Sequence, residues 1–231
     1  MPDPGGVAGV LFDIDGTLIS TGGASDRAWR RAFAELYGVE VNVGDYTGKG
    51  VTDPVVGETS FRGAIGREPT GEEMARLMAL RLRYLPEEVA SSPGYRVLPG
   101  AESTLDELID AGVLCGLITG NVEAAAHIKL ARANLNRYFS FGGYGSDAPE
   151  RVDVARCALE RAERVSGGRL DRNRCLAVGD TPVDVEAAHG AGVRIVGVAT
   201  GSYDVDALRA AGADHVLETL AEPLPLAGIS A

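Results

Sequence analysis

At 231 residues, the chain is long enough for one large domain or for a core with a smaller accessory domain. Hydrophobic residues make up 45% of it, enough to bury a core, yet no apolar run approaches the ~20 residues that a membrane-spanning helix needs. The net charge of −11 argues against a nucleic-acid partner, because phosphate backbones recruit basic surfaces.

The first predicted element is a buried strand over residues 9–14, a short apolar run that contains Asp13 and leads directly into a polar segment. The stretch over 19–96 then has the patterns of helices and none of strands. A helical insertion directly after the first strand predicts a small cap domain. We therefore expect an α/β core made of residues 1–18 and 97–231 and a helical cap made of residues 19–96.

Two helices are expected within this insertion. One face of the first carries four apolar side chains, Trp29, Ala32, Phe33 and Leu36. Ser25 or Asp26 is its candidate N-cap. The second helix opens with a capping box formed by Thr70 and Glu73 and is expected to stop at Pro86, because proline lacks the backbone N–H and clashes with the preceding turn.

Four further apolar runs predict strands, at 113–118, 175–178, 194–199 and 215–217. Helical patterns that stop near glycine lie between most of the runs. Over 101–111, for example, Leu105, Leu108 and Ile109 share a face, and Gly112 is the expected C-cap. Strands that are apolar throughout and alternate with helices are typical of a Rossmann-like parallel sheet with helices on both faces.

Polar residues lie at the ends of three of the predicted strands. The first strand ends in Asp13-Ile14-Asp15-Gly16-Thr17, the second in Thr119-Gly120-Asn121, and a later one in Gly179-Asp180, with Asp184 four residues further on. In open parallel sheets, ligands bind outside the carboxyl ends of the strands. We therefore expect these residues to meet at one edge of the sheet.

Four carboxylates would gather there, those of Asp13, Asp15, Asp180 and Asp184. Like charges this close repel one another unless a cation neutralises them, and an oxygen-only ligand set selects magnesium over zinc. The Thr119 hydroxyl and the backbone N–H groups that open the next helix suit a phosphate oxygen. The pattern predicts a metal-assisted phosphoryl-transfer site; for an Asp after a strand taken singly, a helix cap is the alternative.

At these residues the chain resembles the haloacid dehalogenase superfamily, specifically its phosphoglycolate phosphatase-like branch with a helical cap. The first motif of the family stands here as Asp13-Ile14-Asp15-Gly16-Thr17-Leu18, the second as Ile118-Thr119-Gly120-Asn121 and the fourth as Gly179-Asp180-Thr181-Pro182-Val183-Asp184. Their order and spacing agree with the family over nearly the whole chain. The resemblance implies a magnesium-dependent phosphatase that acts on a small phosphorylated metabolite.

The resemblance also implies roles for individual residues. Asp13 would be the nucleophile that forms an aspartyl-phosphate, and Asp15 would protonate the leaving alcohol and then deprotonate the attacking water. Magnesium would be held by the Asp13 carboxylate, the Asp15 backbone carbonyl and Asp180. Asp184 would be a further ligand or would hold a metal-bound water. The second motif would bind the phosphate through Thr119, Gly120 and Asn121.

The third motif of the family, usually a lysine that offsets negative charge, is missing from its expected segment. Of the two lysines in the chain, Lys129 falls mid-helix and is expected to be solvated, and Lys49 lies in the predicted cap. Arg151 is the best substitute, because Asp147 and Glu150 have capping-box spacing and would place it in the first turn of a helix at the sheet edge. The alternative is an exposed Arg151 paired with a local carboxylate.

The glycine-rich run over 44–50 is similar to a nucleotide-binding P-loop, but only three residues separate its glycines and Gly50 stands where Ser or Thr should bind magnesium. We interpret the run as a cap loop, which in the family faces the active site. Lys49, Thr52 and Asp53 are then its candidate substrate contacts. A solvated loop is the alternative.

Other functions remain open. A phosphomutase of the β-phosphoglucomutase type would use the same residues but return the phosphoryl group to a sugar. A 2-haloacid dehalogenase is less favoured, because its chemistry needs neither magnesium nor an acid at Asp15. A non-catalytic phosphate- or metal-binding regulator is disfavoured by the pair Asp13 and Asp15, since binding alone would not need both.

The three cysteines, Cys115, Cys157 and Cys175, are odd in number and lack the spacing of a zinc or redox site. Free thiols in a reducing compartment are the favoured interpretation. We therefore expect a soluble cytoplasmic enzyme, a monomer or homodimer, with a small phosphorylated metabolite as its partner and no membrane or nucleic acid.

Overall fold

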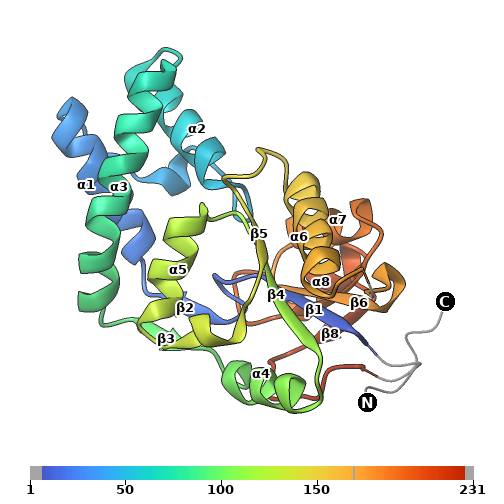
Figure 1. Cartoon of the computed structure of the whole chain (residues 1–231). Helices are drawn as coiled ribbons and strands as arrows, with labels where there is room; N and C mark the ends of the chain where they lie inside the picture. The colour runs from blue at the N-terminus through green and yellow to red at the C-terminus, as the bar shows by residue number, and fades with distance from the viewer. Residues whose placement is uncertain (1–6, 169, 227–231) are drawn as a thin grey trace.

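A computed structural model of the chain describes residues 7–168 and 170–226. Its centre is a six-stranded sheet in the order β5-β4-β1-β6-β7-β8, in which neighbouring strands are parallel (Figure 1). The strands are β1 (Gly9–Phe12), β4 (Leu114–Thr119), β5 (Gly142–Tyr144), β6 (Cys175–Gly179), β7 (Arg194–Val198) and β8 (His215–Leu217). The predicted Rossmann-like α/β fold is confirmed.

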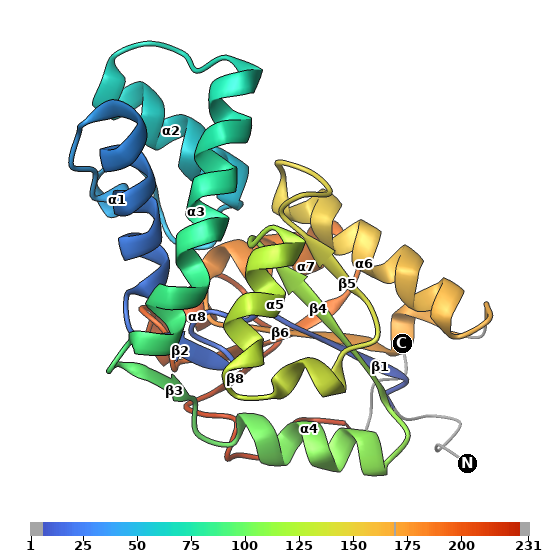
Figure 2. The same ribbon diagram turned by 60° about the vertical axis from the view of Figure 1, so that its left-hand side comes forward.

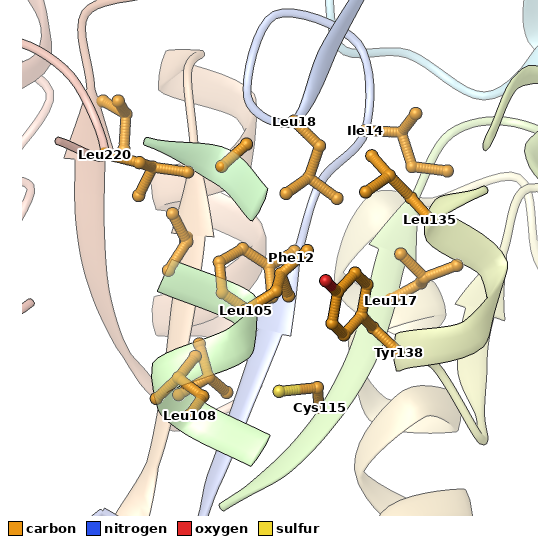
Figure 3. Close-up of a cluster of buried hydrophobic side chains, with 14 of the residues drawn as sticks. Phe12, Ile14, Leu18, Leu105, Leu108, Cys115, Leu117, Leu135, Tyr138 and Leu220 are labelled. Atoms are coloured by element: carbon orange, nitrogen blue, oxygen red, sulfur yellow. The ribbon is translucent and has the colours of Figure 1, made fainter. Parts of the chain in front are cut away.

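Helices cover both faces of this sheet. One face carries α4 (Ala101–Asp110) and α5 (Glu123–Ala131), and the other carries α6 (Arg151–Val165), α7 (Pro182–Gly190) and α8 (Val205–Ala210). Successive β1 side chains point to opposite faces. Phe12 therefore packs beside Leu105 and Leu117 in the first core (Figure 3), whereas Leu11 packs with Val154 in the second. Burial on both faces explains why the strands are apolar throughout.

Three further helices form a group with its own core, α1 (Ala24–Tyr37), α2 (Asp53–Ile65) and α3 (Gly71–Ser91). This core contains Trp29, Phe33, Phe61 and Leu77. Figures 1 and 2 show the group at one end of the sheet, beside α5. Short 3-10 helices complete the fold, η1 (Val43–Asp45), η2 (Leu135–Tyr138) and η3 (Arg172–Arg174).

The helical group joins the sheet through two short strands, β2 (Ile19–Thr21) and β3 (Tyr95–Val97), which pair antiparallel. The expectation of helices alone over 19–96 is therefore wrong at both ends of that stretch. Three residues are too few to show strand alternation, and the pairing depends on two segments that are distant in the sequence. The exact division into a core and a cap stays a prediction.

Helix α3 begins with the predicted capping box of Thr70 and Glu73, but it does not stop at Pro86. The helix continues to Ser91, past a proline that costs about 3 kcal/mol or more in a helix interior. On either side of this proline, Leu85 and Val89 are buried in a cluster with side chains of α1. We attribute the continuation to this packing, which offsets the local penalty.

Two smaller expectations about helices are also wrong. The N-cap of α1 is Gly23, at φ 79°, rather than Ser25 or Asp26, so the helix begins earlier at a left-handed residue that glycine adopts easily. Ile109 is 46% exposed, because the buried stripe of α4 ends at Leu108.

The sheet also contains a strand that the sequence does not predict, β5. Gly142 and Gly143 have low strand propensity, yet β5 pairs with β4 at the sheet edge. A Cβ atom on Gly143 would lie 2.1 Å from the carbonyl oxygen of Val154. Glycine is thus required here, because α6 packs directly against the strand backbone.

None of the helices in the described residues is both long and apolar enough to cross a membrane. The three cysteines are free, and Cys115 and Cys175 are buried, which raises the pKa of each thiol to about 12. Both are therefore inert at neutral pH.

Candidate active site

The end of β1 places Asp13 and Asp15 at the carboxyl edge of the sheet. The backbone N–H of Asp13 donates to the carbonyl oxygen of Val178 in β6 (2.9 Å), which extends the strand pairing by one residue. Gly16 then turns the chain at φ 91°. A Cβ atom at Gly16 would lie 2.3 Å from Asp180 Oδ2, so only glycine lets the first and fourth motifs approach this closely.

The end of β6 supplies Asp180 and, one helical turn later, Asp184. Asp180 Oδ1 accepts a hydrogen bond from the Thr17 hydroxyl (3.1 Å). Thr181 and Asp184 form a capping box at the start of α7, in which Asp184 Oδ2 accepts from the Thr181 backbone N–H (3.1 Å) and hydroxyl (2.7 Å). Helix capping thus holds Asp184 at the site.

Asp13, Asp180 and Asp184 form a compact carboxylate cluster. One oxygen of each lies within 4.8 Å of the others, and all three residues are buried. Burial, followed by repulsion from Asp184, raises the pKa of Asp13 to about 7 and that of Asp180 to about 9. Carboxylates in this situation favour a neutralising cation, and the oxygen-only donors fit magnesium.

Asp15 lies apart from this cluster. Its Oδ2 accepts from Lys129 Nζ (2.7 Å) and from Asn121 Nδ2 (2.7 Å). Desolvation alone would raise the pKa of the Asp15 carboxyl, but the Lys129 ammonium and the hydrogen bonds from Lys129 and Asn121 hold it below its ordinary value. Its side chain therefore does not join the metal-binding cluster, and only its backbone remains as a candidate ligand.

The expectation that Lys129 is solvated is wrong. Its side chain is 3% exposed, and Nζ contacts Asn121 Oδ1 (2.6 Å) as well as Asp15. A signal for this burial was present in the sequence. Ala125, Ala126, Lys129 and Leu130 share the buried side of α5, so a face count along the helix points Lys129 inward.

The second motif lies beside these two aspartates. β4 ends at Thr119, whose buried hydroxyl accepts from the Asn121 backbone N–H (3.2 Å) and Nδ2 (2.8 Å). A Cβ atom on Gly120 would lie 2.4 Å from the carbonyl oxygen of Val51, so a loop of the helical group packs against the motif. The motif therefore lies between the sheet and this loop.

Arg151 opens α6 and is 7% exposed. Its Nη2 donates to Asp13 Oδ1 (3.4 Å) and to Asp184 Oδ1. The capping box expected before it is absent, because Asp147 accepts instead from the Tyr144 backbone N–H (2.9 Å) and pairs with Arg161. The guanidinium lies beside the proposed nucleophile, and the exposed alternative is wrong.

The predicted substrate contacts of the cap loop divide into two kinds. Lys49 lines the cavity over the carboxylates, which has a volume of about 420 Å³. Thr52 and Asp53 instead fasten the loop: the Thr52 hydroxyl donates to the Pro149 carbonyl oxygen (3.0 Å), and Asp53 Oδ2 pairs with Arg81 (2.8 Å). The run over 44–50 begins inside η1 and does not follow a strand, so no P-loop forms.

Asp53 also contacts the second motif directly. Its backbone N–H donates to the Gly120 carbonyl oxygen (2.7 Å), and its Oδ2 accepts from the Val122 backbone N–H (2.8 Å). The pair of Asp53 with Arg81 is almost fully buried, and sequence reasoning does not reveal it. Asp53 thus joins the helical group, through Arg81, to the second motif, through Gly120 and Val122.

Comparisons with known proteins agree with this geometry. The family model of haloacid dehalogenase-like hydrolases matches residues 7–192. The chain is 30% identical to phosphoglycolate phosphatases of Agrobacterium fabrum, over 84% of this chain and 82% of that protein, and of Pectobacterium atrosepticum, over 97% and 94%. A solved structure of a predicted phosphoglycolate phosphatase from Haemophilus somnus superposes with a TM-score of 0.75 at 21% identity, covering 93% of this chain and 95% of that one.

The family match covers the first, second and fourth motifs and the helical group between them. The predicted resemblance is therefore confirmed, as is the prediction of a phosphatase-type hydrolase. The chain belongs to the haloacid dehalogenase-like hydrolases, in their phosphoglycolate phosphatase-like branch.

Proposed function

We propose that the protein is a magnesium-dependent phosphomonoester hydrolase that acts on a small phosphorylated metabolite, of which phosphoglycolate is the first candidate. The observation that carries the proposal is the separation of two kinds of aspartate at one edge of the sheet. Asp13 lies in a buried cluster with Asp180, Asp184 and Arg151, whereas Asp15 is held outside it by Lys129.

The donor set of the cluster fits magnesium. Asp13 and Asp180 would hold the ion together with the Asp15 backbone carbonyl, and Asp184 would bind it directly or through water. When bound, the ion offsets the repulsion between the carboxylates and the phosphate and stabilises charge in the transition state.

Asp13 and Asp15 would act in both half-reactions, Asp13 as the group that carries the phosphoryl and Asp15 as the group that moves protons. In the first, Asp13 Oδ attacks phosphorus, the bond from phosphorus to the ester oxygen breaks, and Asp15 gives a proton to the leaving alcohol. In the second, Asp15 takes a proton from a water that attacks phosphorus, so that inorganic phosphate leaves and the Asp13 carboxylate is restored. Asp15 thus recovers its proton in each cycle. Lys129 favours the ionised carboxyl in the free protein, so the acid form would arise once the negative charge of a bound phosphate raises the pKa of Asp15.

The phosphate would be held by the second motif and by Arg151. Thr119 and the Gly120 backbone N–H would supply neutral donors, with the Thr119 hydroxyl held in place by Asn121, and the Arg151 guanidinium would supply a charged one. Since Arg151 already contacts Asp13, a phosphate bound to that residue would lie within its reach. Lys49, on the opposite wall, would contact the rest of the substrate.

The size of the substrate follows from the cavity and from the relatives. A cavity of about 420 Å³ suits a small metabolite. The relatives named above are phosphoglycolate phosphatases, and we carry that substrate to this chain as the first to test. We also propose that the enzyme acts in the cytoplasm as a monomer or homodimer.

Phosphate release tests the proposal. The purified protein is incubated with magnesium and a panel of phosphomonoesters that includes phosphoglycolate and hexose phosphates, and inorganic phosphate is measured beside the organic products. Phosphate in equal amount to the alcohol supports a hydrolase. A phosphorylated sugar isomer in place of phosphate would indicate a phosphomutase, and no turnover of any ester would refute the proposal.

A further inference from the structure

We propose that Lys129 is a positioning residue for Asp15, separate from Arg151, which serves the nucleophile. This inference rests on the proposed function, because it assigns a task to Lys129 within the same reaction. It divides between two cations the charge-offsetting role that one lysine usually serves in the family.

The side chain of Lys129 reaches the site from the middle of α5 and is almost fully buried. Burial of an ammonium group is unfavourable unless it is paired and hydrogen-bonded. Nζ meets this requirement with two contacts, Asp15 Oδ2 at 2.7 Å and Asn121 Oδ1 at 2.6 Å. The ammonium group is therefore held by protein partners and not by water.

The contacts form a closed network. Asn121 Nδ2 donates to the same Asp15 oxygen (2.7 Å) and to the Thr119 hydroxyl (2.8 Å), so that the second motif and Lys129 hold one carboxylate together. The backbone of the lysine is fastened as well, because its carbonyl oxygen accepts from the Tyr95 hydroxyl in β3 (2.8 Å).

The two buried cations contact different carboxylates. Arg151 pairs with Asp13 and Asp184, whereas among the described residues Lys129 pairs only with Asp15. An effect of Lys129 on the chemistry must therefore pass through Asp15 or Asn121. This arrangement makes it a positioning residue and leaves the nucleophile to Arg151.

The geometry also indicates what is positioned. Both donors reach Oδ2, and within the described part of the chain no hydrogen bond occupies Oδ1. Asp15 lines the cavity, and 38% of its side chain is exposed there. Two bonds to one oxygen fix the carboxylate, and the other oxygen stays available to give a proton to the ester oxygen or take one from water.

Kinetics with two substrates tests this role. The leaving group of p-nitrophenyl phosphate departs as a stable anion, whereas that of phosphoglycolate needs a proton. We expect Lys129→Met to lower kcat/KM for phosphoglycolate by ~10²-fold and for p-nitrophenyl phosphate by less than about tenfold. Lys129→Arg should recover part of the loss.

A double-mutant cycle separates the inference from the proposed function. If Lys129 acts through Asp15, adding Lys129→Met to Asp15→Asn should cost no further activity toward phosphoglycolate. Equal losses on both substrates, or the same loss in the Asp15→Asn background, would overturn the positioning role. A full phosphoglycolate rate in Asp15→Asn alone would instead refute the proposed function.

Two further variants control for folding. Tyr95→Phe removes the hydrogen bond to the backbone of Lys129 but keeps its ammonium, so any loss should be equal on the two substrates. Thermal unfolding shows whether each variant is native. If Lys129→Met does not fold, Lys129→Gln replaces it, because glutamine keeps a hydrogen-bond donor and removes the charge. A loss of kcat/KM that is equal on the two substrates would again contradict the positioning role.

Discussion

The two walls of the cavity hold their charges differently. On the sheet side, Asp13, Asp184 and Arg151 are buried and paired with one another. On the side of the helical group and its linking strands, Lys49 and Arg96 line the cavity, are exposed, and have no ion-pair partner among the described residues. One wall is preorganised, and the other is free to adapt.

We infer that this difference separates chemistry from recognition. Charges fixed by buried partners need no reorganisation when the reaction begins, which is how active sites stabilise a transition state. Exposed cations such as Lys49 and Arg96 adjust to a substrate but contribute little each, because water screens them. We therefore expect losses of turnover from the sheet side and modest changes in KM from the helical side.

The largest effect is expected at the nucleophile. Asp13→Asn should fold and lose essentially all turnover, because an amide cannot form the acyl-phosphate. Steady-state phosphate release checks this, with circular dichroism as the control for folding. A variant that kept a tenth of the wild-type rate would show that the sheet wall does not supply the nucleophile.

Metal removal should be nearly as severe. Excess chelator should abolish phosphate release, and magnesium should restore it, because the clustered carboxylates need a neutralising cation. Asp180→Ala should raise the magnesium concentration required for half-maximal rate, measured by titration. Undiminished activity in chelator would end the case for a metal-assisted mechanism.

The buried pair of Asp53 with Arg81 should contribute to stability more than to catalysis. Asp53→Ala should lower the free energy of unfolding by about 3–5 kcal/mol, because it leaves the buried Arg81 unpaired. Urea denaturation measures the loss, and Asp53→Asn, which keeps the acceptor for Val122, should lose less. An Asp53→Ala protein as stable as the parent would mean that this pair does not hold the loop.

Arg151 should show an intermediate effect on catalysis. Arg151→Ala should lower kcat/KM by ~10²-fold, about the loss of one transition-state contact, and Arg151→Lys should recover part of it. The measurement is a substrate titration of both variants with phosphoglycolate. Near wild-type kinetics for the alanine variant would leave Arg151 as a structural partner of Asp184.

The smallest effect is expected on the helical wall. Lys49→Ala should raise KM by no more than about fivefold, the equivalent of ~1 kcal/mol, with kcat little changed. Lys49→Arg is the matched control that keeps the charge. A large fall in kcat would place Lys49 in the chemistry and remove the distinction between the walls.

The sequence by itself determined which residues lie at the edge of the sheet. Each candidate aspartate lies at or shortly after the end of a short apolar run, and parallel strands bring such ends together whatever lies between them. Asp13, Asp180 and Asp184 therefore assemble as expected. Strand β5 is the exception. Its two glycines have low strand propensity, so the sequence does not predict it, and the strand depends on pairing with β4 and packing against α6.

Only the tertiary structure decided which charges pair. Lys129 and Asp15 are 114 residues apart, and Arg151 and Asp13 are 138 apart, so no local pattern records either contact. The same holds for Pro86, where packing against another helix overrides the local penalty. Local sequence fixes periodicity and strand ends, whereas the energy of a buried charge depends on neighbours that only the folded chain brings near.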